Sequence, residues 1–274
     1  MTALPSGPGP FAATLRRYRT ARRMSQLDLA LACEVSARHL SFLESGRAQP
    51  SREMVLTLAA GLLLPRAARN GLLQAAGFAS AFPASPLGSE ALGPFRAILS
   101  DMMARHAPNP ALLCDRHWCL LGANAPAQLL LDALDGGAGP VNLVRLMTDN
   151  PRAPAVIANL PEVLAEMLAR LELEALEAAD DPLLADLVQC LRRASARHPH
   201  RATTRRPVVP LVFNAPQGRL SFLSAIAHFG TSEDVTVRDL RLELFFPADE
   251  ATREAMEGFT STPARPCGEG AGLR

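Results

Sequence analysis

The sequence predicts two domains, an all-α N-terminal domain of five helices and an α+β C-terminal domain with an antiparallel sheet. Three observations support this fold class. Apolar residues recur at helical spacing through residues 11–78. A stretch rich in Pro, Gly and Ser at 79–91 interrupts that pattern and is expected to be a linker. Beyond Pro110, short runs with a period of two residues lie before and after a long helical region. With 274 residues, the chain is long enough for two domains of ordinary size.

The first domain is expected at 11–78, after a flexible arm at 1–10 that is rich in Pro and Gly. Within it, the apolar spacing and the capping residues predict five short helices in a compact arrangement. The expected helices are at 11–21, 25–33, 36–44, 51–62 and 65–76.

The second and third helices should meet at a sharp corner. Ser25 and Ser36 are typical N-caps, because a serine oxygen accepts a hydrogen bond from the first helical turn. Only Glu34 and Val35 separate the two helices, and Val35 is the apolar residue expected to fill the angle between them. Gly46 provides the stop of the third helix.

The second domain is expected at 92–258, followed by a disordered tail at 259–274. In its last strand, Leu240, Leu242 and Leu244 alternate with other side chains, which predicts a sheet with one protected face. The expected elements are a helix at 90–106, strands at 111–114 and 118–122, helices at 124–134, 141–147, 155–178 and 181–197, strands at 208–214, 219–229 and 240–246, and a helix at 249–258.

Charge is distributed unevenly between the two domains. Residues 1–78 contain ten arginines and four acidic residues, a net charge of +6, which leaves −5 for the rest of a chain whose total is +1. A basic head on a mildly acidic body indicates a nucleic-acid-binding module joined to another domain. The five cysteines are odd in number and scattered, and no apolar run approaches the roughly 18 residues of a membrane span, so we expect a cytoplasmic protein.

The corner and its surroundings resemble a known family. They are similar to the lambda-repressor-like helix-turn-helix domain shared by lambda-type repressors, Cro proteins and the Xre-like bacterial regulators. This resemblance implies a transcription regulator that binds double-stranded DNA. The residues that carry it are Leu15, Arg16, Arg19, Ser25, Gln26, Leu29, Ala30, Val35, Ser36, Leu40, Leu43, Glu44, Gly46, Arg47 and Pro50.

The resemblance implies a role for each of these positions. The third helix presents its outer residues to the major groove, where Arg38 is the one side chain able to hold guanine through O6 and N7. Gln26 is expected to bind phosphate at the start of its helix, and Arg19 and Glu44 are expected to form an internal ion pair. The expected DNA-binding residues are Gln26, Ser36, Ala37, Arg38, His39, Ser41, Phe42, Arg47 and Arg52. Because one such domain contacts one half-site, a homodimer is expected.

The second domain resembles the ligand-binding domain of MmyB-like transcription regulators, with a PAS-like order of strands and helices. The residues that carry this resemblance are 114–118, 122–125, 141–145, 149–151 and 218–247. The tryptophan usual early in the long helix is missing, and Ile157 or Leu160 stands nearby. The resemblance implies a small apolar, fatty-acid-like effector and no cofactor. The expected ligand-binding residues are Leu129, Leu143, Arg145, Met147, Met167, Phe213, Phe222, Ile226, Leu242 and Leu244; Arg205 and Arg206 are further candidates for a carboxylate.

Other interpretations remain open at this point. The same apolar side chains can fill a solid core instead of lining a cavity. Cys114, His117 and Cys119 lack a fourth nearby ligand, so a zinc site is not expected. No nucleophile elbow, phosphate loop or paired-carboxylate motif is present, and no enzyme is expected. The alternatives to an effector-binding regulator are a DNA-tethered enzyme or metal-dependent protein, and a scaffold whose second domain only dimerises.

Overall fold

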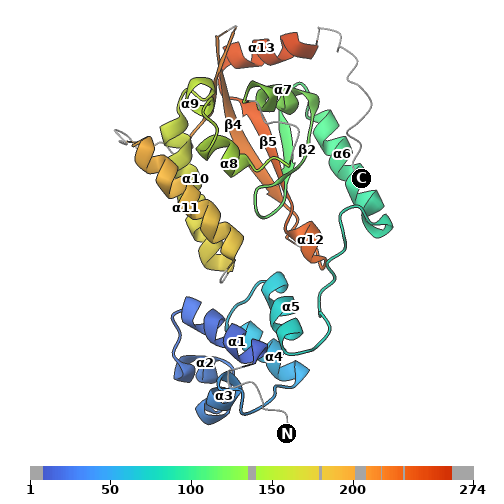
Figure 1. The fold of residues 1–274 in the computed structure, drawn as a ribbon. Helices are drawn as coiled ribbons and strands as arrows, with labels where there is room; N and C mark the ends of the chain where they lie inside the picture. Colours follow the sequence, from blue (N-terminus) through green and yellow to red (C-terminus); the bar gives the residue numbers. More distant parts are fainter. Residues whose placement is uncertain are drawn as a thin grey trace. The chain divides into compact units, whose positions relative to one another are not determined.

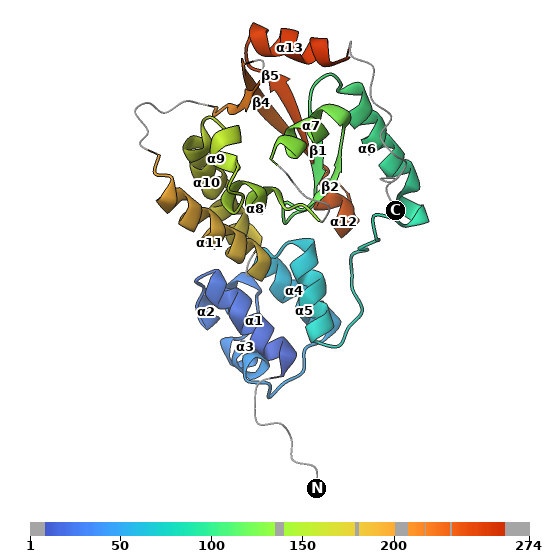
Figure 2. The same cartoon turned by 45° about the horizontal axis from the view of Figure 1, so that its top comes forward.

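The computed structural model describes residues 9–134, 140–178, 181–200, 208–216, 218–230 and 232–260 (Figures 1 and 2). It divides into two compact units, one of residues up to Pro83 with Glu172–Ala185, and one of Ala84–Leu171 with the residues from Asp186 onward. Most of the expected arm and tail, together with Arg205 and Arg206, lies outside the described residues.

The five expected helices of the N-terminal unit are confirmed. They are α1 (Pro10–Ala21), α2 (Gln26–Ala32), α3 (Ala37–Glu44), α4 (Arg52–Gly61) and α5 (Arg66–Ala75). Their apolar faces enclose one core. Its completely buried members are Leu15, Leu29, Leu40, Leu43, Val55, Leu58, Ala59, Leu72 and Leu73.

Serine caps and one tight turn set the geometry of α2 and α3. The hydroxyl oxygens of Ser25 and Ser36 each accept a backbone N–H from the first turn of their helix at 3.1 Å. Between the helices, Glu34 has a φ of 56°, in the left-handed region, so the chain turns sharply there. The next residue, Val35, packs against the core and thereby fills the corner.

The C-terminal unit contains one five-stranded antiparallel sheet, which confirms the α+β fold class. The strand order is β2-β1-β5-β4-β3, so the first and last strands in sequence meet in its middle. The strands are β1 (Ala111–Cys114), β2 (Leu120–Ala123), β3 (Leu211–Ala215), β4 (Gly218–His228) and β5 (Arg241–Pro247).

Helices cover both faces of this sheet (Figures 1 and 2). Helix α6 packs Leu99 and Met103 against Leu113 and Leu242 on one face. The expectation of a single protected face was therefore wrong, because α7, α8 and α10 close off the other face around a cavity. The helices of this part of the chain are η1 (Glu90–Leu92, a 3-10 turn), α6 (Gly93–Arg105), α7 (Ala125–Ala133), α8 (Leu143–Thr148), α9 (Ala153–Val156), α10 (Leu160–Ala178), α11 (Pro182–Arg197), α12 (Val235–Arg238) and α13 (Glu250–Thr260).

The prediction of a single long helix at 155–178 was wrong, because the structure has two helices there, α9 and α10. Ile157 has an extended ψ of 106° and forms an isolated bridge with Phe213 of β3. The Asn159 side chain then binds the same strand, accepting the Val212 N–H at 3.0 Å. Pro161 lies in the first turn of α10, where a proline is tolerated because the missing N–H breaks no helical hydrogen bond. The apolar spacing remains helical through this break, but the backbone leaves the helical conformation at Ile157 to pair with β3. Helix α12 was not expected either.

Candidate DNA-binding surface and ligand cavity

The N-terminal half of α3 presents the residues that are expected to read bases. Ser36, Ala37 and Arg38 are exposed, and Phe42, one turn further along, is half-buried. The Arg38 guanidinium lies over the Phe42 ring at 5.4 Å from its centroid. Such a cation–π contact limits the conformations of a long side chain before it binds. His39 and Ser41, also expected at this surface, are half-buried.

A hydrogen-bonded network lies behind this helix. Glu44, at the end of α3, accepts hydrogen bonds from Arg19 at 2.6 and 2.8 Å and from Gln26 Nε2 at 2.8 Å. Burial opposes ionisation of Glu44 most strongly, but the bonds from Arg19 and Gln26 and the charges of Arg19 and Arg16 outweigh it and lower its pKa. Gln26 keeps one amide N–H for a phosphate, because its nitrogen carries two. The network thus holds Gln26 in place while leaving it a free donor.

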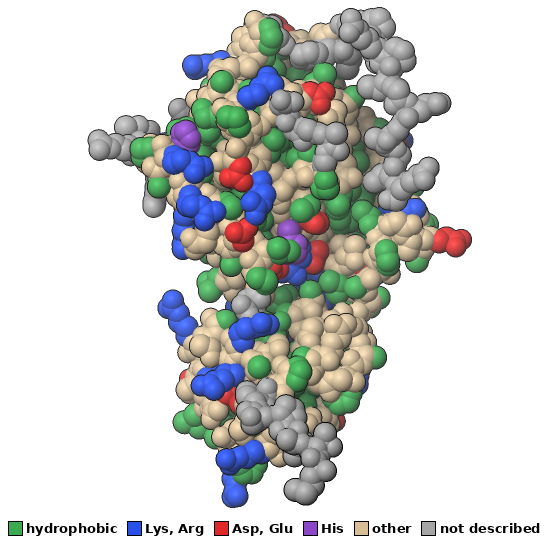
Figure 3. Space-filling view, viewed as in Figure 1, with side chains coloured by type: hydrophobic (Ala, Val, Ile, Leu, Met, Phe, Trp, Pro, Cys, Tyr) green, Lys and Arg blue, Asp and Glu red, His purple; other side chains and the backbone are tan. Residues whose placement is uncertain are grey.

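The two arginines expected to contact phosphate are exposed on either side of the loop after α3. Arg47 follows Gly46, whose φ of 73° ends the helix. Arg52 is the first residue of α4, which Ser51 caps. Figure 3 shows more basic than acidic side chains over the α1–α3 part of the N-terminal unit. A surface of this sign attracts the phosphate backbone.

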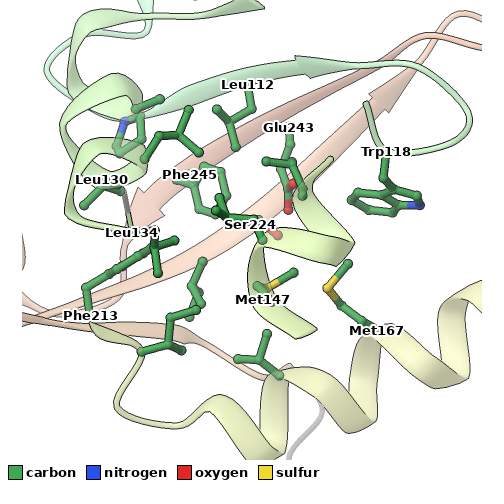
Figure 4. A pocket seen from close by; sticks show the side chains of 18 of the residues that line it. Leu112, Trp118, Leu130, Leu134, Met147, Met167, Phe213, Ser224, Glu243 and Phe245 are labelled. Atoms are coloured by element: carbon green, nitrogen blue, oxygen red, sulfur yellow. The ribbon is translucent and has the colours of Figure 1, made fainter. Parts of the chain in front are cut away.

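The C-terminal unit encloses a cavity of about 110 Å³ between the sheet and helices α7, α8 and α10 (Figure 4). This volume exceeds several-fold the roughly 10–15 Å³ that one water molecule needs by a comparable measure. Apolar side chains account for 17 of the 21 lining residues, among them Leu130, Leu134 and Phe213. A mostly apolar cavity with a few polar groups is typical of a small-molecule site.

The four polar lining residues are Glu166, Arg170, Ser224 and Glu243. In Figure 4 the oxygens of Glu243 and Ser224 face each other inside the cavity. Glu243 is half-buried and lines the cavity. Burial raises the pKa of Glu243; a hydrogen bond from Ser224 and the charges of Arg170 and Arg241 oppose this, and Glu166 adds to it.

Four of the ten residues expected to bind the effector line this cavity: Leu143, Met147, Met167 and Phe213. Phe222 and Ile226 lie on the same face of the sheet but do not line the cavity, Phe222 being packed behind Phe213 and Phe245. Their roles in binding stay predictions.

The other four lie away from the cavity. Leu242 and Leu244 pack toward α6 on the opposite face of the sheet. Leu129 is 52% exposed on α7. Arg145 is half exposed and forms ion pairs with Asp149 and Asp186. The expected placement of Leu242 and Leu244 failed because both faces of β5 are covered, so their alternation with Glu243 and Phe245 does not show which set faces the cavity.

Sequence reasoning missed the polar residues of the cavity. Of these residues, only Glu243 could have been predicted from the sequence. An acidic side chain in a strand between apolar residues is rarely buried unless it has a partner. Arg170 and Ser224 carried no such signal. Among the described residues, no group of three or more His, Cys, Asp or Glu is arranged to hold a metal ion. Within the same residues, no helix is long and apolar enough to cross a membrane.

Two family models match the chain. One, described as MmyB-like transcription regulator ligand binding domain, matches residues 95–258, more than half of the chain. The other, described as helix-turn-helix domain, matches residues 10–72. The helix-turn-helix domain and the MmyB-like ligand-binding domain that the sequence predicts are thereby confirmed. A search of curated proteins found no match.

Proposed function

Because this chain belongs to the family with an MmyB-like transcription regulator ligand binding domain, we propose that a small apolar effector occupies the cavity of the C-terminal unit. A helix-turn-helix domain joined to such a domain makes the chain a ligand-responsive, DNA-binding transcription regulator. The proposal adds where the effector binds and what class of molecule it is. Fatty-acid-like molecules are the first candidates, and we assign the regulator to the Xre family.

The observation that carries the proposal is the chemistry of the cavity wall. Leu130, Leu134 and Phe213 gather at one end, away from Trp118 and Glu243 (Figure 4). An alkyl chain at the apolar end would remove apolar surface from water, which stabilises a complex by roughly 25 cal/mol per Å². An amphipathic molecule therefore fits the cavity better than a wholly polar one.

For DNA, we propose that Arg38 reads a base in the major groove and that Arg47, Arg52 and Gln26 hold phosphates. Arg38 is exposed and partly ordered by Phe42, as a base-reading side chain needs to be. Each chain has one helix-turn-helix motif and so contacts one half-site. We therefore propose that the regulator acts as a homodimer on a near-palindromic operator.

A cavity-filling variant tests the proposal. Ala127 is 1% exposed and lines the cavity, whereas Ala133 is exposed on the same helix, α7. Once an operator has been selected from random duplexes, its affinity for the full chain is measured with and without octanoic acid, octanol and octylamine. At least one of these probes should change the operator affinity, and Ala127→Phe should abolish that response while Ala133→Phe retains it.

Two results would contradict the proposal. A chain that shows no preference among duplexes at moderate salt is not a sequence-specific regulator. An effector response that survives unchanged in Ala127→Phe places the effector outside this cavity. Thermal unfolding of both variants shows whether the larger side chain has disturbed the fold, since overpacking a core costs about 1–3 kcal/mol.

A further inference from the structure

Glu243 is a half-buried acid of the cavity wall whose hydrogen-bonding capacity is largely unused. An ionised carboxylate offers about four acceptor positions. Ser224 forms a hydrogen bond with this carboxyl, and the neighbouring Arg170 forms its ion pair with Glu166. Buried polar groups in native proteins are nearly always hydrogen-bonded. The remaining positions face the cavity, where a bound molecule can fill them (Figure 4).

The neighbouring arginines have contacts with other residues. Arg170 is 3.3 Å from Glu166 and lies over the Trp118 ring at 5.8 Å. Arg241 lies over the same ring at 4.9 Å. Both arginines favour the ionised form of Glu243 from a distance, Glu166 opposes it, and burial outweighs them, so the pKa is raised. The site therefore holds a carboxyl for which the protein provides one hydroxyl.

This arrangement discriminates among the head groups of an amphipathic molecule. A carboxylate next to Glu243 would place two like charges in a site of low dielectric constant, and one of them would have to be protonated. An ammonium or hydroxyl group instead donates hydrogen bonds to the carboxyl, and an ammonium also neutralises it. The alkyl part of either molecule can point toward Leu134 and Phe213 at the apolar end.

We propose that the effector has a hydrogen-bond-donating head group, an amine or a hydroxyl, which pairs with the carboxyl of Glu243 beside Ser224. This inference rests on the proposed function, because it requires that the effector occupy this cavity. Among the small apolar effectors of the proposed function, it favours an amphipathic amine or alcohol over the fatty-acid-like molecules named there as first candidates.

Trp118 provides the readout, since it lines the cavity and is the only tryptophan in the sequence. Octylamine, octanol and octanoic acid have the same alkyl chain and differ in the head group. Each is titrated into the full chain at pH 8 while Trp118 emission is followed. Octylamine and octanol should bind at least about tenfold more tightly than octanoic acid, a difference of about 1.4 kcal/mol. The comparison of octylamine with octanol then decides between the two donor classes.

Two further measurements test the role of Glu243. Glu243→Gln removes the charge with little change in shape, and it should reduce the preference for octylamine over octanoic acid to less than about threefold. Glu254→Gln removes an acid that is exposed on α13, and it should leave the preference intact. In the unmodified chain, octylamine should bind more tightly as the pH rises through the raised pKa of Glu243, because the carboxyl ionises while the amine stays protonated. This pH series needs no variant to fold.

Octanoic acid binding most tightly at pH 8, or a preference that Glu243→Gln does not change, overturns the inference. In either case a response of operator affinity to octanoic acid leaves the proposed effector cavity standing. If none of the three probes alters Trp118 emission or operator affinity, both the inference and the effector cavity fail.

Discussion

The guanidinium of Arg19 donates hydrogen bonds to both carboxylate oxygens of Glu44, with Nε–Oε1 at 2.6 Å and Nη2–Oε2 at 2.8 Å. This ion pair joins α1 to the end of α3, and its side chains are only 13% and 3% exposed. Arg19 also donates its Nη1 to the Met24 carbonyl at 2.7 Å, just before α2 begins. One arginine therefore ties together the three helices that position the predicted base-reading residues.

Removing the cation of this pair should destabilise the N-terminal unit. Arg19→Met leaves Glu44 buried without its charged partner, and we expect the free energy of unfolding to fall by about 3–5 kcal/mol. Urea denaturation followed by far-ultraviolet circular dichroism measures the loss, and Trp118 emission reports on the C-terminal unit separately. The double variant Arg19→Met/Glu44→Leu should recover most of the stability. A single variant as stable as the unmodified protein would show that the pair contributes little.

The same pair predicts a dependence of stability on pH. Because the pKa of Glu44 is lower in the folded state than in the unfolded chain, its stabilising contribution is fully present above the unfolded value. The contribution is lost as the pH falls through the folded pKa. The difference in unfolding free energy between the unmodified protein and Arg19→Met should therefore shrink in acid. A difference that stays constant down to about pH 2 would contradict this assignment, since unfolded glutamates titrate near 4.3.

The arginines on either side of Gly46 should differ in what they contribute to DNA binding. Arg38→Ala should relax sequence preference at one base pair and cost roughly 1–3 kcal/mol there. Arg47→Ala should weaken specific and random duplexes alike and reduce the slope of log affinity against log salt. Binding titrations over a range of salt concentrations, on the selected operator and on its single-base variants, separate the two effects. Equal losses on both kinds of DNA from both variants would argue against this division of roles.

Much of the N-terminal unit could be predicted because its determinants are local. Ser25 and Ser36 cap helices through hydrogen bonds within three residues, and the short spacing between those helices allows only a sharp turn. The cavity depends on contacts between segments distant in sequence. Leu242 and Glu243 are adjacent in β5, and only the placement of α6 on one face and α7, α8 and α10 on the other decides which of them meets an effector.

The break at Ile157 was unpredictable for the same reason. Its apolar spacing fits a helix as well as a strand contact, and the choice is made by the bridge to Phe213, more than fifty residues later in the chain. Helical periodicity alone does not register such a competing partner.

Asn70 should hold the start of the linker against α5. Its Oδ1 accepts the N–H groups of Ala81 and Phe82 at 3.0 and 3.1 Å, and its Nδ2 donates to the Phe82 carbonyl at 2.8 Å. Asn70→Ala leaves these backbone groups without partners and should cost about 1–3 kcal/mol. Hydrogen exchange at the Ala81 and Phe82 amides should accelerate correspondingly. Gln74→Ala, which removes an exposed bond to Ser80, is the matched control and should change stability little. Slow exchange persisting in Asn70→Ala would contradict the anchoring role.

The effect of Gly61→Ala on stability should depend on the residue at position 33. The substitution should destabilise the protein when Cys33 is present and stabilise it when Cys33 is replaced by alanine. A Cβ added at Gly61, the last residue of α4, would lie 2.3 Å from the sulfur of Cys33, which is 7% exposed. Gly61→Ala alone should therefore destabilise the N-terminal unit, although alanine is intrinsically the better helix former by about 1 kcal/mol.

In a Cys33→Ala background the sulfur is gone, and the other neighbours of the added Cβ are at 3.5 Å or more, an ordinary contact distance. The same Gly61→Ala change should then stabilise the unit, because only its gain in helix propensity remains. Urea denaturation of the four proteins in this cycle measures the coupling between the two positions. A destabilising effect of similar size in both backgrounds would mean that the contact with Cys33 is not what keeps glycine at the end of α4.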